Sequence, residues 1–177
     1  SYKFVGSITY FHTLYTNLIS TLYNPATWFT SAYVNVGKAQ AHGIEVSGTV
    51  RPADNLKVKG GYTYQKAWDY SNDQDLVRRP RDKFFVETFW QATKKLSFDV
   101  SLRYVGPRAD NTSSPAFGTN TYKDKGFAVM DAVINFDLTK NLSVYAKMDN
   151  LMNKYYEDTR GFTTSPFAAY GGVKAKF

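Results

Sequence analysis

The sequence predicts an all-β protein, an antiparallel transmembrane β-barrel, and three observations lead to this fold class. First, apolar and polar residues alternate along most of the extended segments, as in residues 96–105. This period of two is that of a strand with one face in lipid and the other in water. Second, the segments that join these strands are by turns long and very short, which is typical of outer-membrane barrels. Third, no stretch approaches the roughly 18 consecutive apolar residues that a membrane-spanning helix needs.

Two strands, residues 2–15 and 33–51, open the chain. A long connection rich in Asn, Thr and aromatic residues joins them. Their apolar positions are Phe4, Gly6, Ile8 and Tyr10 in the first and Ile44, Val46, Gly48 and Val50 in the second. The second strand ends in a tight turn at residues 52–55, because Pro and Asn favour such turns.

The next two strands are residues 56–65 and 82–92, and the polar loop 71–75 lies between them. The apolar positions of the third strand are Leu56, Val58, Gly60, Tyr62 and Tyr64. In the fourth strand we assign Phe84, Val86, Thr88 and Trp90 to the outward face. The inward set of this strand is mixed in polarity and comprises Lys83, Phe85, Glu87 and Phe89.

The last four strands begin after a short turn at residues 93–95. They are residues 96–105, 130–137, 142–149 and the segment that ends at residue 177. Long connections are expected at 106–125 and 151–167, and a short turn at 139–141. The expected outward residues are Leu96, Phe98, Val100, Leu102, Tyr104, Met130, Ala132, Ile134, Phe136, Leu142, Val144, Ala146 and Met148.

This order of long and short connections predicts an orientation. Outer-membrane barrels keep their short turns on the periplasmic side and their long loops outside. The turns at residues 52–55, 93–95 and 139–141 are therefore expected in the periplasm, together with both ends of the chain. Eight strands satisfy this parity.

Composition agrees with a membrane barrel and argues against other classes. The chain has 14 Tyr and 13 Phe, and aromatic side chains favour the membrane interface. The absence of Cys excludes a disulfide framework. The net charge is +7, but the Lys and Arg residues are scattered over turns, loops and inward positions, so we expect no nucleic-acid binding. The sequence opens directly inside a strand and does not begin with a signal peptide, so we expect a processed or partial chain.

Four stretches of the chain carry a family pattern. They are residues 33–39 (YVNVGKA) continuing to 43–46 (GIEV), 78–80 (RRP), 150–156 (NLMNKYY) and 172–177 (GVKAKF). In this order and spacing they resemble TonB-dependent outer-membrane receptors, most closely the cobalamin-transporter type, over nearly the whole chain. Met152 departs from the pattern, since the family usually has Phe there.

The resemblance implies that residues 1–177 are the C-terminal portion of a barrel of about 22 strands, without the N-terminal plug domain. It implies a bacterial outer-membrane receptor that imports a ferric siderophore, haem or a cobalamin when the TonB complex acts on the plug. The alternative is a self-contained eight-stranded barrel that serves as an anchor or as a membrane hydrolase or acyltransferase. Both readings pair the strand edges, because an unpaired edge in lipid costs several kcal/mol per polar group.

Three arginines are candidates for contact with an anionic ligand or with lipopolysaccharide. Arg78 and Arg79 precede a strand at the expected extracellular rim, and Arg108 lies in a long loop. Guanidinium groups bind phosphate and carboxylate groups well. Alternatively, Arg78 and Arg79 form ion pairs with loop carboxylates such as Asp73 or Asp75.

Other polar residues carry weaker signals. His12 and His42 are the only histidines and have no companions at metal-ligand spacing, so we favour wall residues over a metal site. The carboxylates Glu45, Glu87, Asp99 and Asp131 invite an acid/base reading, but a hydrated lumen needs such residues too. No nucleophile and base can be inferred from the spacing, so we expect neither catalysis nor a cofactor.

The C-terminus carries a pattern of its own. Phe177, Ala175, Val173 and Gly171 fall on one face. A terminal aromatic residue preceded by apolar residues at every second position resembles the signal that the barrel assembly machinery recognises. We therefore assign Phe177 and Val173 to that signal.

Overall fold

One antiparallel sheet dominates the protein. The computed structural model describes residues 3–23, 30–70, 73–114 and 118–177, while side chains within 18–36 and 111–121 lie outside the description. The strands of the sheet pair in the order β1-β2-β3-β5-β6-β9-β10-β13. They are β1 (Lys3–Tyr23), β2 (Thr30–Ala53), β3 (Leu56–Asp69), β5 (Asp82–Gln91), β6 (Leu96–Val105), β9 (Phe127–Asp137), β10 (Leu142–Asp149) and β13 (Ala168–Ala175). The predicted all-β meander is confirmed, because each of these strands pairs with the next one along the chain.

The long connections contain structure that the sequence did not predict. The expected loop 106–125 contains the hairpin of β7 (Arg108–Ser114) and β8 (Gly118–Asp124). The connection 151–167 contains a smaller hairpin of β11 (Glu157–Thr159) and β12 (Phe162–Thr163), and β4 (Gln74–Asp75) pairs with β3. Abundant Gly, Pro, Asn and Ser indicated loops, but the backbone groups of a long loop can still pair with each other.

The first connection is also shorter than expected. β1 continues to Tyr23, which pairs with Thr30 at the start of β2, so the segment predicted as a long loop mostly extends this hairpin. Residues 16–23 are rich in Thr, Leu and Ile, and β-branched residues favour strands. Residues 24–29 of the predicted loop lie outside the described residues.

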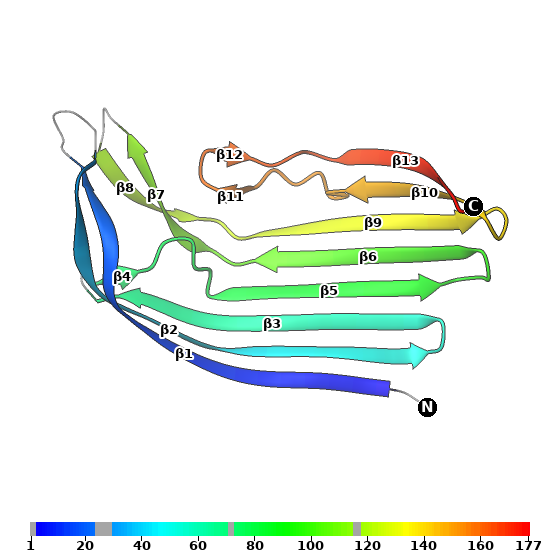
Figure 1. Ribbon diagram of the computed structural model, residues 1–177, viewed down its shortest axis with the longest axis horizontal. Coiled ribbons are helices and arrows are strands. Elements are labelled where there is room, and N and C mark those ends of the chain that lie inside the picture. The colour runs from blue at the N-terminus through cyan, green and yellow to red at the C-terminus, as the bar shows by residue number, and fades with distance from the viewer. Residues whose placement is uncertain (1–2, 24–29, 71–72, 115–117) are drawn as a thin grey trace.

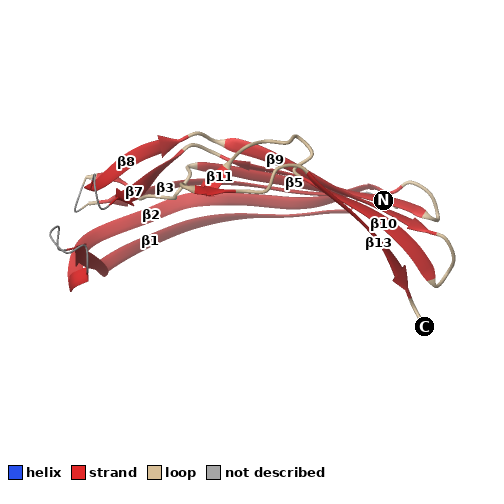
Figure 2. Ribbon diagram, turned by 90° about the horizontal axis from the view of Figure 1, so that it is seen from above, coloured by secondary structure: helices blue, strands red, loops and turns tan. Residues whose placement is uncertain are grey.

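The sheet is curved and open. Figure 1 places the three short turns and both chain ends at one end of the sheet, and the hairpins β7–β8 and β11–β12 at the other. The predicted parity of the connections is therefore confirmed. β1 and β13 form opposite edges, and no strand pairing of the described residues joins them (Figure 2). The alternative in which eight strands close on themselves is not what the structure shows.

The strand register confirms the two faces. Residues directly opposite each other on neighbouring antiparallel strands lie on the same face of the sheet. Val86 is opposite both Gly60 and Leu102, and Trp90 is opposite Leu56 and Phe98. The outward assignment of β5 is thus correct despite its mixed inward residues.

Aromatic pairs border the outward face at both ends. Near the short turns, the rings of Trp90 and Phe98 stack at 5.5 Å, and towards the loops those of Phe84 and Tyr104 stack at 5.2 Å. The six residue steps from Phe84 to Trp90 correspond to about 20 Å along the strand. Aromatic residues at both borders of an apolar surface are typical of an outer-membrane barrel, whose apolar band is flanked by aromatic girdles.

The large outward side chains are not buried in a core, although the small outward Ala132 is buried. Ile8 is 77% exposed, Val173 is 68% exposed and Val100 in the centre of the sheet is 38% exposed. The buried apolar residues among those described are Ala39, Ala67, Phe127, Val129 and Ala132. Such a large exposed apolar surface marks a contact with lipid or with another protein. Within the described residues, no helix is sufficiently long and apolar to cross a membrane.

Candidate functional site

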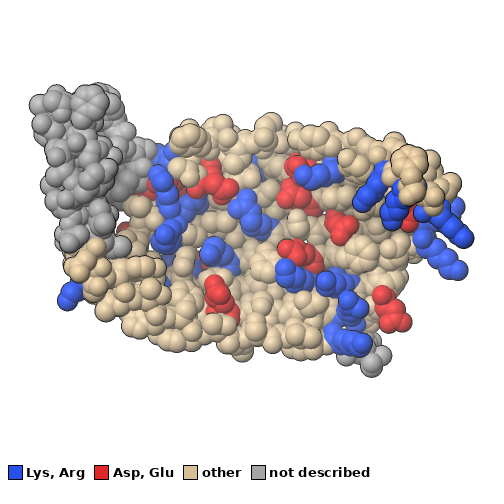
Figure 3. All heavy atoms as spheres, in the orientation of Figure 1, with Lys and Arg blue, Asp and Glu red and all other residues tan. Residues whose placement is uncertain are grey.

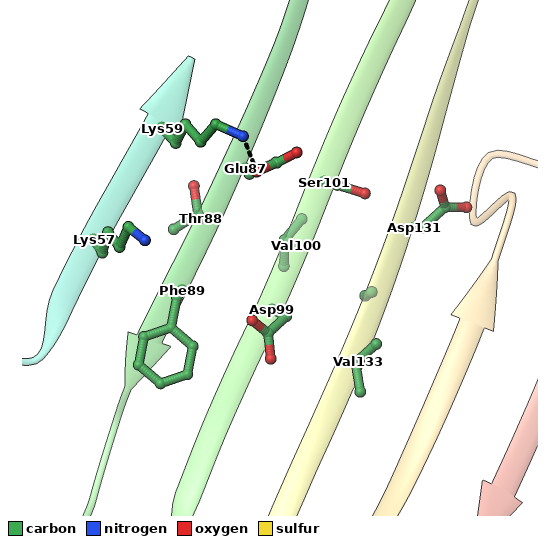
Figure 4. Close-up of a pocket in the computed structure, with 11 residues that line it drawn as sticks. Lys57, Lys59, Glu87, Thr88, Phe89, Asp99, Val100, Ser101, Asp131 and Val133 are labelled. Atoms are coloured by element: carbon green, nitrogen blue, oxygen red, sulfur yellow. Dashed lines mark hydrogen bonds and ion pairs between the residues drawn. The ribbon is translucent and has the colours of Figure 1, made fainter. Parts of the chain in front are cut away.

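The inward face is a polar wall in which residues opposite each other on neighbouring strands form rows across the sheet. Lys59, Glu87, Ser101 and Asp131 are opposite each other on four successive strands. The ammonium of Lys59 lies 3.2 Å from the carboxylate of Glu87. A hollow of about 330 Å³ lies in this wall, and Figure 4 shows Glu87, Ser101 and Asp131 along it, with Asp99 and Phe89 one row nearer the short turns. Figure 3 shows basic and acidic side chains interspersed over one face of the sheet.

At the loop end, arginine and aspartate side chains tie separate segments together. Nε of Arg78 lies 2.8 Å from Oδ1 of Asp110, whose side chain is fully buried. The other oxygen of Asp110 accepts a hydrogen bond of 3.0 Å from the backbone N–H of Arg160. Asp110 therefore connects the segment before β5, the hairpin β7–β8 and the turn between β11 and β12.

Arg108 is buried, with only 5% of its surface exposed. Its Nη2 donates hydrogen bonds of 2.7 and 2.8 Å to the carbonyl oxygens of Glu157 and Asp158. Its guanidinium lies 5.6 Å from the centre of the Phe127 ring. Nη1 of Arg108 is enclosed by protein and has no hydrogen-bond partner among the described residues.

Two further arginines complete this cluster. Arg103 pairs with Asp158 at 3.4 Å and lies 5.8 Å from the ring of Tyr156. Arg160 pairs with Asp124 at 2.6 Å, and its guanidinium lies 3.9 Å from the ring of Tyr122. Ion pairs and cation–π contacts thus hold the two hairpins on the end of the wall.

The β11–β12 turn has its own hydrogen bonds. Gly161 adopts a φ of 85°, which favours glycine, and its N–H donates a hydrogen bond of 2.9 Å to Glu157. This bond, and a second from the hydroxyl of Tyr155, lower the pKa of the Glu157 carboxyl below its usual value. The same contact with Glu157 raises the pKa of Tyr155.

Asn150 fixes the start of the last connection. It is buried, has a φ of 52°, and its backbone N–H donates a hydrogen bond of 2.8 Å to Asp131. Its side chain donates to the carbonyl oxygens of Lys154 and Ser165 and accepts a bond from the N–H of Lys154. The motif at 150–156 therefore folds the chain back on itself at the top of β10.

A basic hollow of about 370 Å³ opens beside this network. It is lined by Gln65, Arg78, Arg79, Pro80, Lys83, Val105, Arg108 and Asp158. The lining contains four cationic side chains and one carboxylate. Asp158 pairs with Arg103 and Arg78 pairs with Asp110, which leaves Arg79, Lys83 and Arg108 as the other cations of the lining. The arrangement is suited to an anionic group.

The structure places the three predicted arginines together around this hollow. Arg79 is exposed and donates a weak hydrogen bond of 3.3 Å to the carbonyl of Arg78. The ion-pair alternative was wrong in its partners, since Arg78 pairs with Asp110, whereas Asp75 pairs with Arg81. Sequence reasoning missed Asp110 and Arg160, and the only signal for Asp110 was its place two residues after Arg108.

The weaker candidates are separate from this cluster. His12 and His42 lie opposite each other on β1 and β2 with ring centres 6.3 Å apart. Within the described residues, no group of three or more His, Cys, Asp or Glu residues is arranged to hold a metal. The carboxylates Glu87, Asp99 and Asp131 line the wall hollow, and Glu45 is exposed on β2. At the other end, Val173 is opposite Val144, and Phe177 follows β13 with its side chain exposed.

A curved antiparallel sheet with an apolar outward face and a polar inward face defines a wall segment of a transmembrane β-barrel. The chain belongs to the TonB dependent receptor-like β-barrel family, whose model matches residues 2–151.

Solved structures of such receptors have the same fold. The ferripyoverdine receptor of Pseudomonas aeruginosa is 19% identical with a TM-score of 0.79, and covers 98% of this chain. The ferric-catecholate import receptor Fiu of Escherichia coli K12 is 22% identical with a TM-score of 0.75, and covers 96%. The copper transporter OprC is 18% identical with a TM-score of 0.77, and covers 99%. The chain spans 25%, 24% and 29% of the lengths of these proteins, respectively.

Proposed function

We propose that this chain is the C-terminal barrel portion of an outer-membrane receptor that imports a scarce, large nutrient with energy supplied through TonB. One observation carries the proposal: the strands of a TonB-dependent receptor barrel present a continuous apolar surface outward and a charged wall inward. A receptor of this kind needs both surfaces, because its wall contacts lipid on one side and an aqueous lumen on the other.

In the proposed receptor, this chain and the plug domain have different roles. Residues 1–177 supply wall, short turns and part of the loop set, and a plug domain elsewhere in the receptor contacts the TonB complex. The long loops face the exterior, and the short turns and the C-terminus face the periplasm, as the parity of the connections supports. The outward face contacts outer-membrane lipid and lipopolysaccharide.

The substrate class is an anionic metal chelate, with haem and cobalamin as the other candidates. Arg78, Arg79, Lys83 and Arg108 give the hollow at the loop end a cationic lining. The structural relatives include ferric siderophore receptors and a copper transporter. The cobalamin type is supported only by the stretch at 33–46.

We assign no catalytic activity to the chain. Among the carboxylates of the wall, Glu87 pairs with Lys59 and Asp131 accepts a hydrogen bond from the backbone N–H of Asn150. Transport by this receptor requires binding and release of a ligand, for which the wall needs no nucleophile.

Uptake by the intact receptor tests the function. Cells that carry the full-length receptor are supplied with ferric hydroxamates, ferric catecholates, haem and cobalamins, with and without an active TonB complex. We expect one class to bind in both strains and to accumulate only in the TonB-competent strain. Absence of binding for all four classes, or uptake that does not depend on TonB, contradicts the proposal.

Charge reversal tests the basic hollow. We expect Arg79→Glu and Lys83→Glu to weaken binding of an anionic chelate at least about tenfold, since each replaces an attraction by a repulsion. Lys95→Glu, in the exposed turn at the opposite end, is the matched control and leaves affinity unchanged. If all three substitutions change the affinity equally, the basic hollow is not part of the ligand site.

The C-terminal residue tests the proposed contact with the assembly machinery. We expect Phe177→Ser to lower the amount of receptor in the outer membrane and to leave it in the periplasm. Phe167→Ser changes an exposed aromatic residue outside the last strand and serves as the control. Normal membrane levels of Phe177→Ser contradict the assignment.

A further inference from the structure

A polar and aromatic patch interrupts the outward face of β1, β2 and β3 just beyond the apolar band. The band ends at the row Tyr10, Ile44 and Tyr64. The next rows towards the loops are His12 with His42 and Lys66, and then Leu14 with Gln40 and Trp68. Parity places all these side chains on the same face as the band. A surface that is apolar over several rows and then becomes basic and aromatic is typical of the level of lipid headgroups in a membrane barrel.

Five of these side chains line a hollow of about 170 Å³. They are Gln40, His42, Lys66, Trp68 and Tyr70, and we call this set the outward patch. The ammonium of Lys66 lies 5.4 Å from the centre of the Trp68 ring. The hollow lies on the outward side of the sheet and is separate from the basic hollow of the inward face, with which it shares no residue.

Hydrogen bonds within the outward patch orient a donor. The hydroxyl of Tyr70 donates to Oε1 of Gln40 at 2.5 Å, so the amide nitrogen of Gln40 is directed at His42. That nitrogen lies 3.3 Å from Nδ1 of His42 and, as a donor, makes Nδ1 the acceptor. The proton of a neutral His42 then resides on Nε2. The relay thus leaves an N–H of His42 for a ligand.

The charge of the outward patch is positive. Among the described residues, Lys66 forms no ion pair. By register the nearest carboxylates are Asp75, opposite Trp68, and Asp82, opposite Tyr64. Asp75 is held by Arg81 at 3.3 Å, and Asp82 accepts a hydrogen bond from the hydroxyl of Tyr62. A cation, an oriented N–H and two amphipathic rings are the groups that bind the phosphate of a lipid whose apolar part continues along the protein.

We propose that the outward patch binds the phosphate of an anionic outer-leaflet lipid. Lys66 and His42 contact the phosphate, Gln40 and Tyr70 position His42, and Trp68, one row farther from the apolar band, packs on the headgroup. The acyl chains then lie along the apolar band, with which the outward patch is continuous. This inference rests on the proposed location of the receptor in the outer membrane.

Lipid binding by the intact receptor tests the inference. The receptor is purified in mild detergent and titrated with lipopolysaccharide, with its dephosphorylated form and with inorganic phosphate, and bound lipid is counted by native mass spectrometry. We expect lipopolysaccharide to bind at least about tenfold more tightly than the dephosphorylated lipid, because a charge-assisted contact is lost. Inorganic phosphate neither binds nor competes at similar concentrations. Equal binding of free phosphate identifies a simple anion site and overturns the proposal.

Paired variants separate the outward patch from a general interfacial belt. Lys66→Gln and His42→Phe should each weaken lipopolysaccharide binding about tenfold, and Lys66→Arg should retain it. Lys57→Gln removes a lysine from the inward face of the same strand and leaves binding unchanged. The proposed lipid site is wrong if Lys66→Gln binds lipopolysaccharide as tightly as the unaltered receptor does. It is also wrong if Lys57→Gln lowers the affinity as much as Lys66→Gln does.

The outcome is distinguishable from failure of the proposed function. Heat-dependent electrophoretic mobility shows whether each variant is a folded barrel, and cell fractionation shows whether it is in the outer membrane. A receptor that is absent from the outer membrane refutes the proposed function. A folded outer-membrane receptor whose lipid affinity does not change with Lys66 or His42 refutes the lipid site alone.

Discussion

The outward and inward faces of the same strands differ in what brings neighbouring side chains together. Outward, the rings of Trp90 and Phe98 stack, and aliphatic rows remain partly exposed. Inward, ion pairs form between Lys59 and Glu87 and between Lys147 and Asp149. One residue step along the backbone separates these two chemistries. Alternate residues of a strand therefore face different environments. The outward apolar side chains contact the surroundings of the sheet, where those of a soluble protein would pack in a core.

The largest expected difference in stability is between an arginine placed on the outward face and an arginine placed on the inward face of the same strand. We expect Val100→Arg to cost about 2–4 kcal/mol of stability in lipid, because the guanidinium enters the apolar band. Ser101→Arg should cost much less, because its neighbours across the sheet are Glu87 and Asp131. Urea unfolding of the intact receptor in lipid vesicles measures both. Equal losses for the two variants refute the assignment of faces.

Two adjacent glycines on β3 provide a finer comparison. A Cβ on Gly61, which faces inward, would lie 2.5 Å from Cε1 of the Phe85 ring, whereas one on Gly60, which faces outward, has no atom nearer than 3.5 Å. We expect Gly61→Ala to destabilise the barrel by about 1–3 kcal/mol, because the ring must move.

Gly60→Ala is the matched control, with an expected change within about 0.5 kcal/mol. The temperature at which the folded form is lost in electrophoresis ranks the two variants. A larger shift for Gly60→Ala than for Gly61→Ala contradicts the packing described for Phe85.

The ion pair between Lys59 and Glu87 should contribute little. Both side chains are about half exposed, at 46% and 52%, so water screens their attraction. A double-mutant cycle with Lys59→Gln and Glu87→Gln should give a coupling of about 0.2–1 kcal/mol. A coupling well above this range indicates that the inward wall is drier than an aqueous lumen.

The smallest effect is local and lies outside the membrane. The pKa of Glu157 is lowered chiefly by the hydrogen bond from the N–H of Gly161. The stabilisation from the ionised Glu157 is therefore fully present above pH 4.5, the ordinary pKa of the group. That effect is lost as the pH falls through the lower folded-state pKa.

The amide chemical shift of Gly161 should therefore titrate below pH 4.5 in the intact receptor. Glu157→Gln should abolish this titration. A titration that persists in the variant assigns the shift to another group.

Much of the sheet could be predicted because its signals are local. Alternation in residues 96–105 identifies a strand and its faces, and the short turns leave antiparallel pairing with the next strand as the simplest connection. The hairpins β7–β8 and β11–β12 were missed because Gly, Pro, Asn and Ser are typical of loops and of hairpins alike.

The candidate site could be predicted only in part. Arg78 and Arg79 stood out as a pair before a strand, but the partner of Arg78 is Asp110, 32 residues further along the chain. Arg160 reaches the same carboxylate from 50 residues away. No pattern in the sequence encodes which loops meet, because their contacts depend on the curvature and register of the whole sheet.

The central claim is that alternate residues of each strand contact hydrocarbon and water, and cysteine scanning tests it most directly. This chain has no Cys, so single Cys substitutions at residues 97 to 104 provide unique labels once any Cys elsewhere in the receptor has been replaced. Spin labels at each position are exposed to oxygen, which partitions into lipid, and to a water-soluble nickel chelate. We predict that oxygen accessibility is highest at Phe98, Val100, Leu102 and Tyr104, and nickel accessibility at the residues between them. Accessibility without a period of two, or with the opposite phase, contradicts the account.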